Sequence, residues 1–216
     1  MILGGPSALV WLAAALALIY LIGYCYRGVS WPKTLVKTAS ILLLALMAWQ
    51  MSASNWLVLA LGLCALGDFL LSREDARSFL AGVGAFAAGH LAYITLFLSH
   101  DLAQPAMIVE PPQLYVAIVL ALLSAVMAVV LMPRAGDLRF AILAYIPIIT
   151  GMGIVALALP NVGLLLPGAL LFVVSDFVLA LEMFVFAAQS TARRFTPFVV
   201  WATYWAAQFL LFSALT

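Results

Sequence analysis

Apolar segments of about 20 residues recur along this chain, and their length constrains the fold more than any other feature. A helix of about 20 apolar residues is long enough to cross the hydrocarbon core of a bilayer, which is about 30 Å thick. Of the 216 residues, 68% are hydrophobic and only 8% are charged, whereas about a quarter are charged in soluble domains. We therefore predict an all-α integral membrane protein, with residues 1–216 forming one transmembrane helical domain.

Polar breaks that contain Pro, Gly or charged residues divide the chain into eight predicted transmembrane helices. The spans that we predict are residues 6–26, 35–51, 55–72, 79–99, 113–132, 139–159, 164–188 and 196–215.

The basic residues alternate along these predicted helices. The nine fall in or beside the odd-numbered connections: Arg27, Lys33 and Lys37 at the first, Arg73 and Arg77 at the third, Arg134 and Arg139 at the fifth, and Arg193 and Arg194 at the seventh. Cytoplasmic loops are the loops rich in Lys and Arg. We therefore expect the odd-numbered connections in the cytoplasm and both termini outside. The alternation also favours eight spans, because a missed helix would disturb it.

Two aspartates lie inside apolar helices, where a charged side chain costs about 2.5–3.5 kcal/mol on insertion scales. Asp68 and Asp176 are 108 residues apart, which is half the length of the chain, and each is followed by a Phe. The spacing predicts a parallel internal repeat of four plus four helices, with candidate halves 1–108 and 109–216. A weaker likeness joins His90–Tyr93 to Trp201–Tyr204.

The two aspartates are the candidate catalytic residues. We expect no Lys or Arg within the membrane to pair with them. Two carboxyl groups that are close together in a dry site do not both ionise easily, so one can remain protonated and act as an acid while the other acts as a base. His90, Tyr93, Tyr145, Tyr204 and Gln208 are the polar residues of neighbouring helices that we expect around them. The tyrosines are expected to pack or to position other groups.

Other functions find no support in the composition. The net charge is +1, and no basic stripe is present that could neutralise nucleic acid phosphates. Cys25 and Cys64 are the only cysteines, and neither has the spacing of a zinc ligand. We expect no metal and no disulfide.

Three short motifs together resemble the YhhN family of membrane proteins, which includes bacterial and animal lysoplasmalogenases. They are Gly67-Asp68-Phe-Leu-Leu-Ser72, Gly89-His90-x-x-Tyr93 and Ser175-Asp176. The resemblance implies hydrolysis of the vinyl-ether bond of a lysophospholipid. For this reaction we expect Asp68 and Asp176 to be the acid–base pair, and no cofactor is needed. We further expect His90 and Tyr93 to orient water or substrate, with Tyr145, Ser175, Tyr204 and Gln208 in supporting positions.

Two other functions remain open at this stage. A proton-coupled transporter also uses repeats and buried carboxyl groups. An intramembrane aspartyl protease also uses two membrane aspartates, but Ala65 stands where its fuller Gly-x-Gly-Asp motif has a glycine. We expect a multi-pass protein of the bacterial cytoplasmic (inner) membrane, in contact with membrane lipid. The sequence does not indicate the oligomeric state or which aspartate is the acid.

Overall fold

The described part of the chain is helical, and no strand occurs in it. The structure is a computed structural model that describes residues 6–73 and 75–216. Its α-helices are α1 (Pro6–Gly23), α2 (Trp31–Gln50), α3 (Asn55–Leu71), α4 (Ala76–Leu98), α5 (Gln113–Leu131), α6 (Arg139–Val155), α7 (Leu165–Phe184) and α8 (Thr196–Leu215). Short 3-10 helices, η1 to η4, cover Pro105–Val109, Gly136–Leu138, Ala156–Ala158 and Thr191–Arg194.

Each predicted span corresponds to one α-helix. Six helical segments in the described residues are long and apolar enough to cross a membrane, and α1 and α3 are shorter apolar helices. The 17 residues of α3 extend over about 25 Å, slightly less than the thickness of a hydrocarbon core. Multi-pass membrane insertion is therefore supported, and the number of eight crossings stays a prediction. The predicted position of the N-terminus falls on residues 1–5, outside the described residues.

Several helix boundaries differ from the prediction by three or four residues, among them the end of α1, the start of α4, the end of α6 and the two that follow. Helix α2 begins at Trp31 rather than at residue 35, because the Ser30 side chain accepts a hydrogen bond from the Lys33 N–H and Pro32 occupies the first turn, where a missing N–H costs nothing. Lys33 therefore belongs to the helix, as Lys37 does, and not to the connection before it. Helix α7 ends at Phe184 rather than at residue 188, and the chain continues as a turn.

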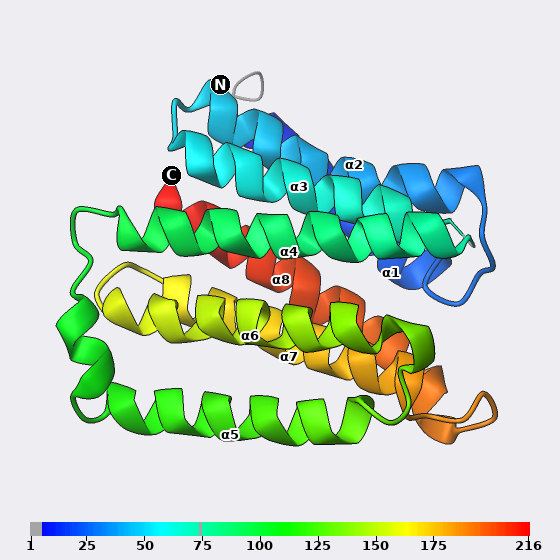
Figure 1. Ribbon diagram of the computed structural model, residues 1–216. Helices are drawn as coiled ribbons and strands as arrows, with labels where there is room; N and C mark the ends of the chain where they lie inside the picture. The colour runs from blue at the N-terminus through cyan, green and yellow to red at the C-terminus, as the bar shows by residue number, and fades with distance from the viewer. Residues whose placement is uncertain (1–5, 74) are drawn as a thin grey trace. The chain divides into compact units, whose positions relative to one another are not determined.

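The helices pack into two compact units. Unit 1 contains the residues up to Tyr93 together with Leu215 and Thr216, and unit 2 contains Ile94–Ala214. Within unit 1, α2 packs against both α1 and α3, and α2 and α3 are antiparallel neighbours (Figure 1). Within unit 2, α6 packs against α5 and α7.

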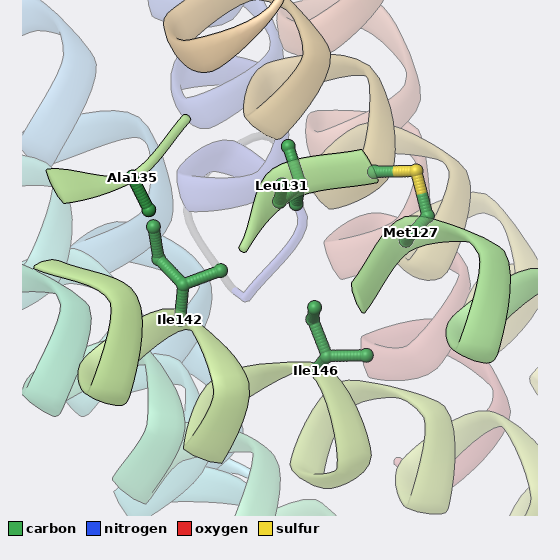
Figure 2. Packing of buried hydrophobic residues seen from close by; sticks show 5 residues of the cluster. All are labelled: Met127, Leu131, Ala135, Ile142 and Ile146. Atoms are coloured by element: carbon green, nitrogen blue, oxygen red, sulfur yellow. The ribbon is translucent and has the colours of Figure 1, made fainter. Parts of the chain in front are cut away.

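An apolar cluster fixes the contact between α5 and α6 in unit 2. Figure 2 shows its buried members, which are Met127, Leu131, Ala135, Ile142 and Ile146. Side chains of α7, including Phe177 and Phe184, pack against this cluster. The α7 segment next to Asp176 is therefore held against α6 by apolar contacts.

Two of the helix boundaries repeat with the spacing of the two aspartates, whereas others, such as the starts of α4 at Ala76 and α8 at Thr196, do not. A shift of 108 residues moves Trp31, the first residue of α2, onto Arg139, the first residue of α6. The same shift moves Gly23, which ends α1, onto Leu131, which ends α5. This correspondence supports the parallel internal repeat, which stays a prediction.

Candidate functional site

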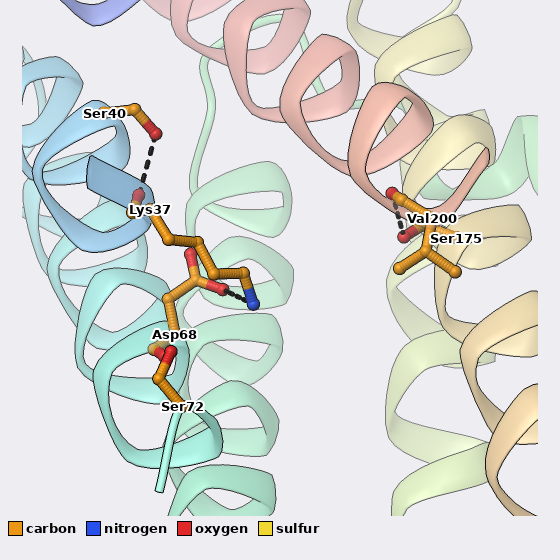
Figure 3. A network of polar contacts seen from close by, with 6 residues as sticks. All are labelled: Lys37, Ser40, Asp68, Ser72, Ser175 and Val200. Carbon is orange, nitrogen blue, oxygen red and sulfur yellow. Dashed lines mark hydrogen bonds and ion pairs between the residues drawn. The ribbon is translucent and has the colours of Figure 1, made fainter. Parts of the chain in front are cut away.

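Asp68 forms an ion pair with a lysine of the neighbouring helix. It lies on α3, three residues before the helix ends at Leu71. Its side chain is 1% exposed, and its Oδ1 is 2.8 Å from Nζ of Lys37, whose side chain is 20% exposed (Figure 3). The expectation that no Lys or Arg would pair with the aspartates is therefore wrong for Asp68. The ammonium group offsets much of the cost of burying the carboxylate.

The local fold brings Lys37 to this position. Lys37 is the seventh residue of α2, about 9 Å along the axis from the start of the helix. The antiparallel helix α3 presents Asp68 near the same end. Closer to that end, the Arg73 guanidinium donates to the Thr34 hydroxyl and lies 4.4 Å from the centre of the Trp31 ring. Polar contacts on successive turns of α2 thus reach Asp68 on α3 and Arg73 just beyond the end of α3.

Small residues set the contact between α3 and α4. A Cβ atom placed on Gly89 would lie 2.9 Å from Cys64 Sγ, and one placed on Gly67 would lie 2.5 Å from the Phe86 ring. Both contacts fit one antiparallel alignment of α3 and α4, in which Gly89 faces Cys64 and Phe86 faces Gly67. In this alignment His90 lies beside the Cys64 level of α3, about one turn, or about 6 Å, from the level of Asp68.

His90 and Tyr93 are both fully buried on α4, one turn apart. The Nδ1 atom of His90 is 2.7 Å from the Phe86 carbonyl oxygen. Because a carbonyl oxygen only accepts, Nδ1 is the donor, and in the neutral ring Nε2 carries the lone pair. The imidazole is therefore held in one tautomer by its own helix.

In unit 2, Asp176 is hydrogen bonded to a tyrosine of the neighbouring helix. The Tyr145 hydroxyl on α6 donates to Oδ2 of Asp176 on α7. Both side chains are half-buried. A hydrogen bond from a neutral hydroxyl to a carboxyl oxygen is possible whether or not Asp176 carries a proton on its other oxygen.

The remaining predicted residues of unit 2 lie between α7 and α8. The Ser175 hydroxyl donates to the Val200 carbonyl oxygen over 3.0 Å (Figure 3). The Tyr204 ring packs edge-on against Phe172, with ring centres 5.3 Å apart. Gln208 is fully buried one turn further along α8. Ser175 and Tyr204 therefore link the two helices, and a positioning role of Tyr204 in a site stays a prediction.

The structure thus places the predicted residues in two separate groups. Asp68, His90 and Tyr93 belong to unit 1, whereas Tyr145, Ser175, Asp176, Tyr204 and Gln208 belong to unit 2. The predicted meeting of the two aspartates joins residues of different units and stays a prediction. Among the described residues, no three His, Cys, Asp or Glu side chains are grouped as metal ligands would be.

Sequence reasoning missed Lys37 as the partner of Asp68. It attributes the charge of Lys37 to a cytoplasmic connection, which is the usual place for a lysine near the end of a membrane helix. The spacing of Lys37 from Asp68 becomes a signal only once the Tyr145–Asp176 contact is known. Lys37 precedes Asp68 by the 31 residues that separate Tyr145 from Asp176.

Comparisons with known proteins agree with the composition and the motifs. A family model described as "YhhN family" matches residues 32–215. "Uncharacterized membrane protein YhhN" of Escherichia coli O157:H7 and the protein of the same name in Shigella flexneri are each 44% identical to this chain over 79 residues. That stretch covers 34% of this chain and only 37% of each of those proteins.

A longer match extends over nearly the whole chain. "Lysoplasmalogenase TMEM86B" of Mus musculus is 31% identical over 213 residues, which are 95% of this chain and 86% of the mouse protein. No solved structure matches. The family model covers all but the first 31 residues and the last residue of a multi-pass membrane protein. The chain therefore belongs to the YhhN family.

Proposed function

We propose that this chain hydrolyses the vinyl-ether bond of a lysoplasmalogen. The products would be a fatty aldehyde and glycerophosphoethanolamine or glycerophosphocholine. The observation that carries the proposal is the similarity, along 95% of the chain, to a mouse protein named as a lysoplasmalogenase. An integral membrane protein is also a suitable enzyme for a single-chain lipid, because the alkenyl chain can remain among apolar helices.

The two aspartates supply the chemistry that this reaction needs. Hydrolysis of a vinyl ether begins with the transfer of a proton to carbon and passes through an oxocarbenium ion. Paired carboxyl groups serve an oxocarbenium-like transition state in glycosidases, where one protonates and the other stabilises the cation or activates water. Asp68 and Asp176 would divide these tasks. This part of the proposal rests on their spacing and on the partner that each has within its own unit.

The polar head of the lipid would lie toward the basic cytoplasmic side. The sequence has all nine Lys and Arg residues in or beside the odd-numbered connections, and a phosphate group is attracted to such a rim. His90 would orient water or substrate through the nitrogen that its Phe86 contact leaves as the acceptor. Tyr93, one turn away, would act with it.

Purified protein in detergent tests the proposal. Wild-type protein should release aldehyde from a lysoplasmalogen and none from the lysophospholipid that has an ester in place of the vinyl ether. Asp68→Asn and Asp176→Asn should each lower the rate by more than 100-fold, about 2.7 kcal/mol. Asp137→Asn is the matched control, because Asp137 is exposed in a connection, and it should retain the wild-type rate.

The assay also separates the competing functions. A transporter requires a sealed membrane and releases no aldehyde in detergent, whereas a protease would cleave a peptide substrate under the same conditions. Wild-type rates in either aspartate variant would show that the two carboxyl groups are not the acid–base pair.

A further inference from the structure

The two aspartates have partners at equivalent positions of the predicted repeat. Lys37 is the seventh residue of α2 and contacts Asp68 on α3. Tyr145 is the seventh residue of α6 and contacts Asp176 on α7. In both cases the partner precedes the aspartate by 31 residues. One interhelical contact therefore occurs twice, with a different donor in each copy.

The two donors differ in charge, and charge determines what each aspartate can do. The Lys37 ammonium stabilises the ionised carboxylate of Asp68 by direct attraction at 2.8 Å in a buried setting. The Tyr145 hydroxyl adds a hydrogen bond to Asp176 but no positive charge. Asp176 can therefore gain and lose a proton while it keeps this contact.

We propose that Lys37 and Tyr145 are positioning residues that give the two aspartates different roles in the proposed hydrolysis. Lys37 holds Asp68 as a permanent carboxylate that stabilises the cationic intermediate. Tyr145 holds Asp176 as the acid that delivers the proton. The assignment rests on the proposed function for its chemistry and on the two contacts for its choice of acid.

The reaction is balanced in protons and electrons. The π electrons of the vinyl ether take the proton of the Asp176 carboxylic acid at the carbon remote from oxygen, which leaves an oxocarbenium ion and an ionised Asp176. Tyr145 donates to this new carboxylate. Water adds to the cationic carbon and returns one proton to Asp176. The resulting hemiacetal breaks its bond to the glycerol oxygen, and its hydroxyl proton passes to that oxygen, giving the aldehyde and the alcohol.

Infrared spectroscopy of the protein in lipid, near neutral pH and without substrate, tests the assignment directly. A protonated carboxylic acid has a carbonyl stretching band that an ionised carboxylate lacks. We expect this band in the wild-type protein, its loss in Asp176→Asn, and its retention in Asp68→Asn. Glu182→Gln is the control on the same helix as Asp176 and should keep the Asp176 band. Loss of the band in Asp68→Asn instead, or no such band in the wild type, would overturn the assignment.

A kinetic measurement tests the part played by the Tyr145 hydroxyl. Tyr145→Phe removes one oxygen atom and should lower kcat by at least about ten-fold, or 1.4 kcal/mol, while KM changes by less than about two-fold. Tyr115→Phe on α5, where the side chain is 61% exposed, should leave both constants unchanged. A Tyr145→Phe enzyme with the wild-type kcat would remove Tyr145 from the mechanism.

The proposed function and the assignment of roles can each be wrong without the other, because aldehyde release tests the first and the infrared band tests the second. If the wild-type protein releases no aldehyde, the proposed function is wrong, and the infrared result still reports which aspartate holds a proton. If aldehyde is released but the band follows Asp68, the hydrolysis stands and the assignment of roles is reversed.

Discussion

At the scale of single residues, the Lys37–Asp68 contact determines whether a carboxylate can be buried on α3. Asp68 is 1% exposed, and an isolated carboxylate at such a position would carry a desolvation penalty of several kcal/mol. The ammonium group lies close enough to form a charge-assisted hydrogen bond, which is about twice as strong as a neutral one. A substitution that removes Lys37 should therefore affect stability before any effect on substrate is considered.

We predict that Lys37→Met lowers the free energy of unfolding by about 3 kcal/mol, since it leaves the buried carboxylate without this charge partner. Denaturation in detergent measures the change. Lys33→Met is the matched control on the same helix. The Lys33 ammonium donates to the Arg27 carbonyl oxygen at the exposed end of the helix, so its loss should cost less than about 1 kcal/mol. Equal losses in the two variants would contradict a special role for Lys37.

The residue scale also shows where sequence reasoning succeeds and where it stops. Asp68 and Asp176 stand out because a carboxyl group in an apolar helix is costly and therefore conspicuous. Their partners do not stand out, because a lysine near the end of a membrane helix, such as Lys37, and a tyrosine within one, such as Tyr145, are both common. Which side chain faces Asp68 depends on how α2 packs on α3, and hydrophobic periodicity within one helix carries no information about that register.

At the scale of helices, glycines of α4 determine how closely α3 approaches. A Cβ on Gly89 would meet Cys64 Sγ at 2.9 Å and the Ala60 carbonyl oxygen at 3.3 Å, and the backbone oxygen has little freedom to move. A Cβ on Gly84, on the same helix, would have no such neighbour within 4 Å. An added methyl group should therefore have opposite effects at the two glycines.

We predict that Gly89→Ala destabilises the protein by about 1–3 kcal/mol through overpacking. Gly84→Ala should instead stabilise it by up to about 1 kcal/mol, because alanine is the better helix former. Thermal or denaturant unfolding of the two variants in detergent provides the comparison. A stabilising Gly89→Ala would show that α3 and α4 do not pack as closely as described.

The start of α4 should depend on pH. Asp75 accepts a hydrogen bond from the Ser78 N–H over 2.8 Å, as an N-cap residue does. Its hydrogen bonds with Ser78 lower the pKa of the Asp75 carboxyl from its ordinary value of 3.8. The pKa of Asp75 is lower in the folded protein than in the unfolded chain. The ionised Asp75 therefore stabilises the start of α4 fully above about pH 4, and this stabilisation is lost as the pH falls through the pKa of Asp75 in the folded protein.

We therefore expect amide hydrogen exchange in the first turn of α4 to become faster as the pH is lowered below about 4, after correction for the intrinsic exchange rate. Asp75→Ala should remove this dependence and show fast exchange in that turn at every pH. An unchanged acid response in the variant would assign it to another group.

At the scale of the whole molecule, the predicted helix boundaries are close to those observed because long apolar runs and their polar breaks are local signals. The early start of α2 depends on Ser30 as a cap, which is also a local signal and could have been used. The repeat, by contrast, gains its support from tertiary contacts, namely the two pairs with the same spacing of 31 residues. Such support cannot be obtained from the likeness of two short motifs in apolar sequence.

The number of membrane crossings can be tested through the sides on which the connections lie. If α3 crosses, three helices separate Gly28 from Asp101, and the two positions lie on opposite sides of the membrane. If the short α3 does not cross, they lie on the same side.

We predict that Gly28→Cys reacts with an impermeant thiol reagent only from the cytoplasmic side and Asp101→Cys only from the outside, in a background without Cys25 and Cys64. Asp137→Cys and Gln189→Cys, which are exposed in odd-numbered connections, should behave as Gly28→Cys does. Reaction of Gly28→Cys and Asp101→Cys from the same side would remove α3 from the spanning helices and contradict the parallel internal repeat, in which α3 with Asp68 corresponds to α7 with Asp176.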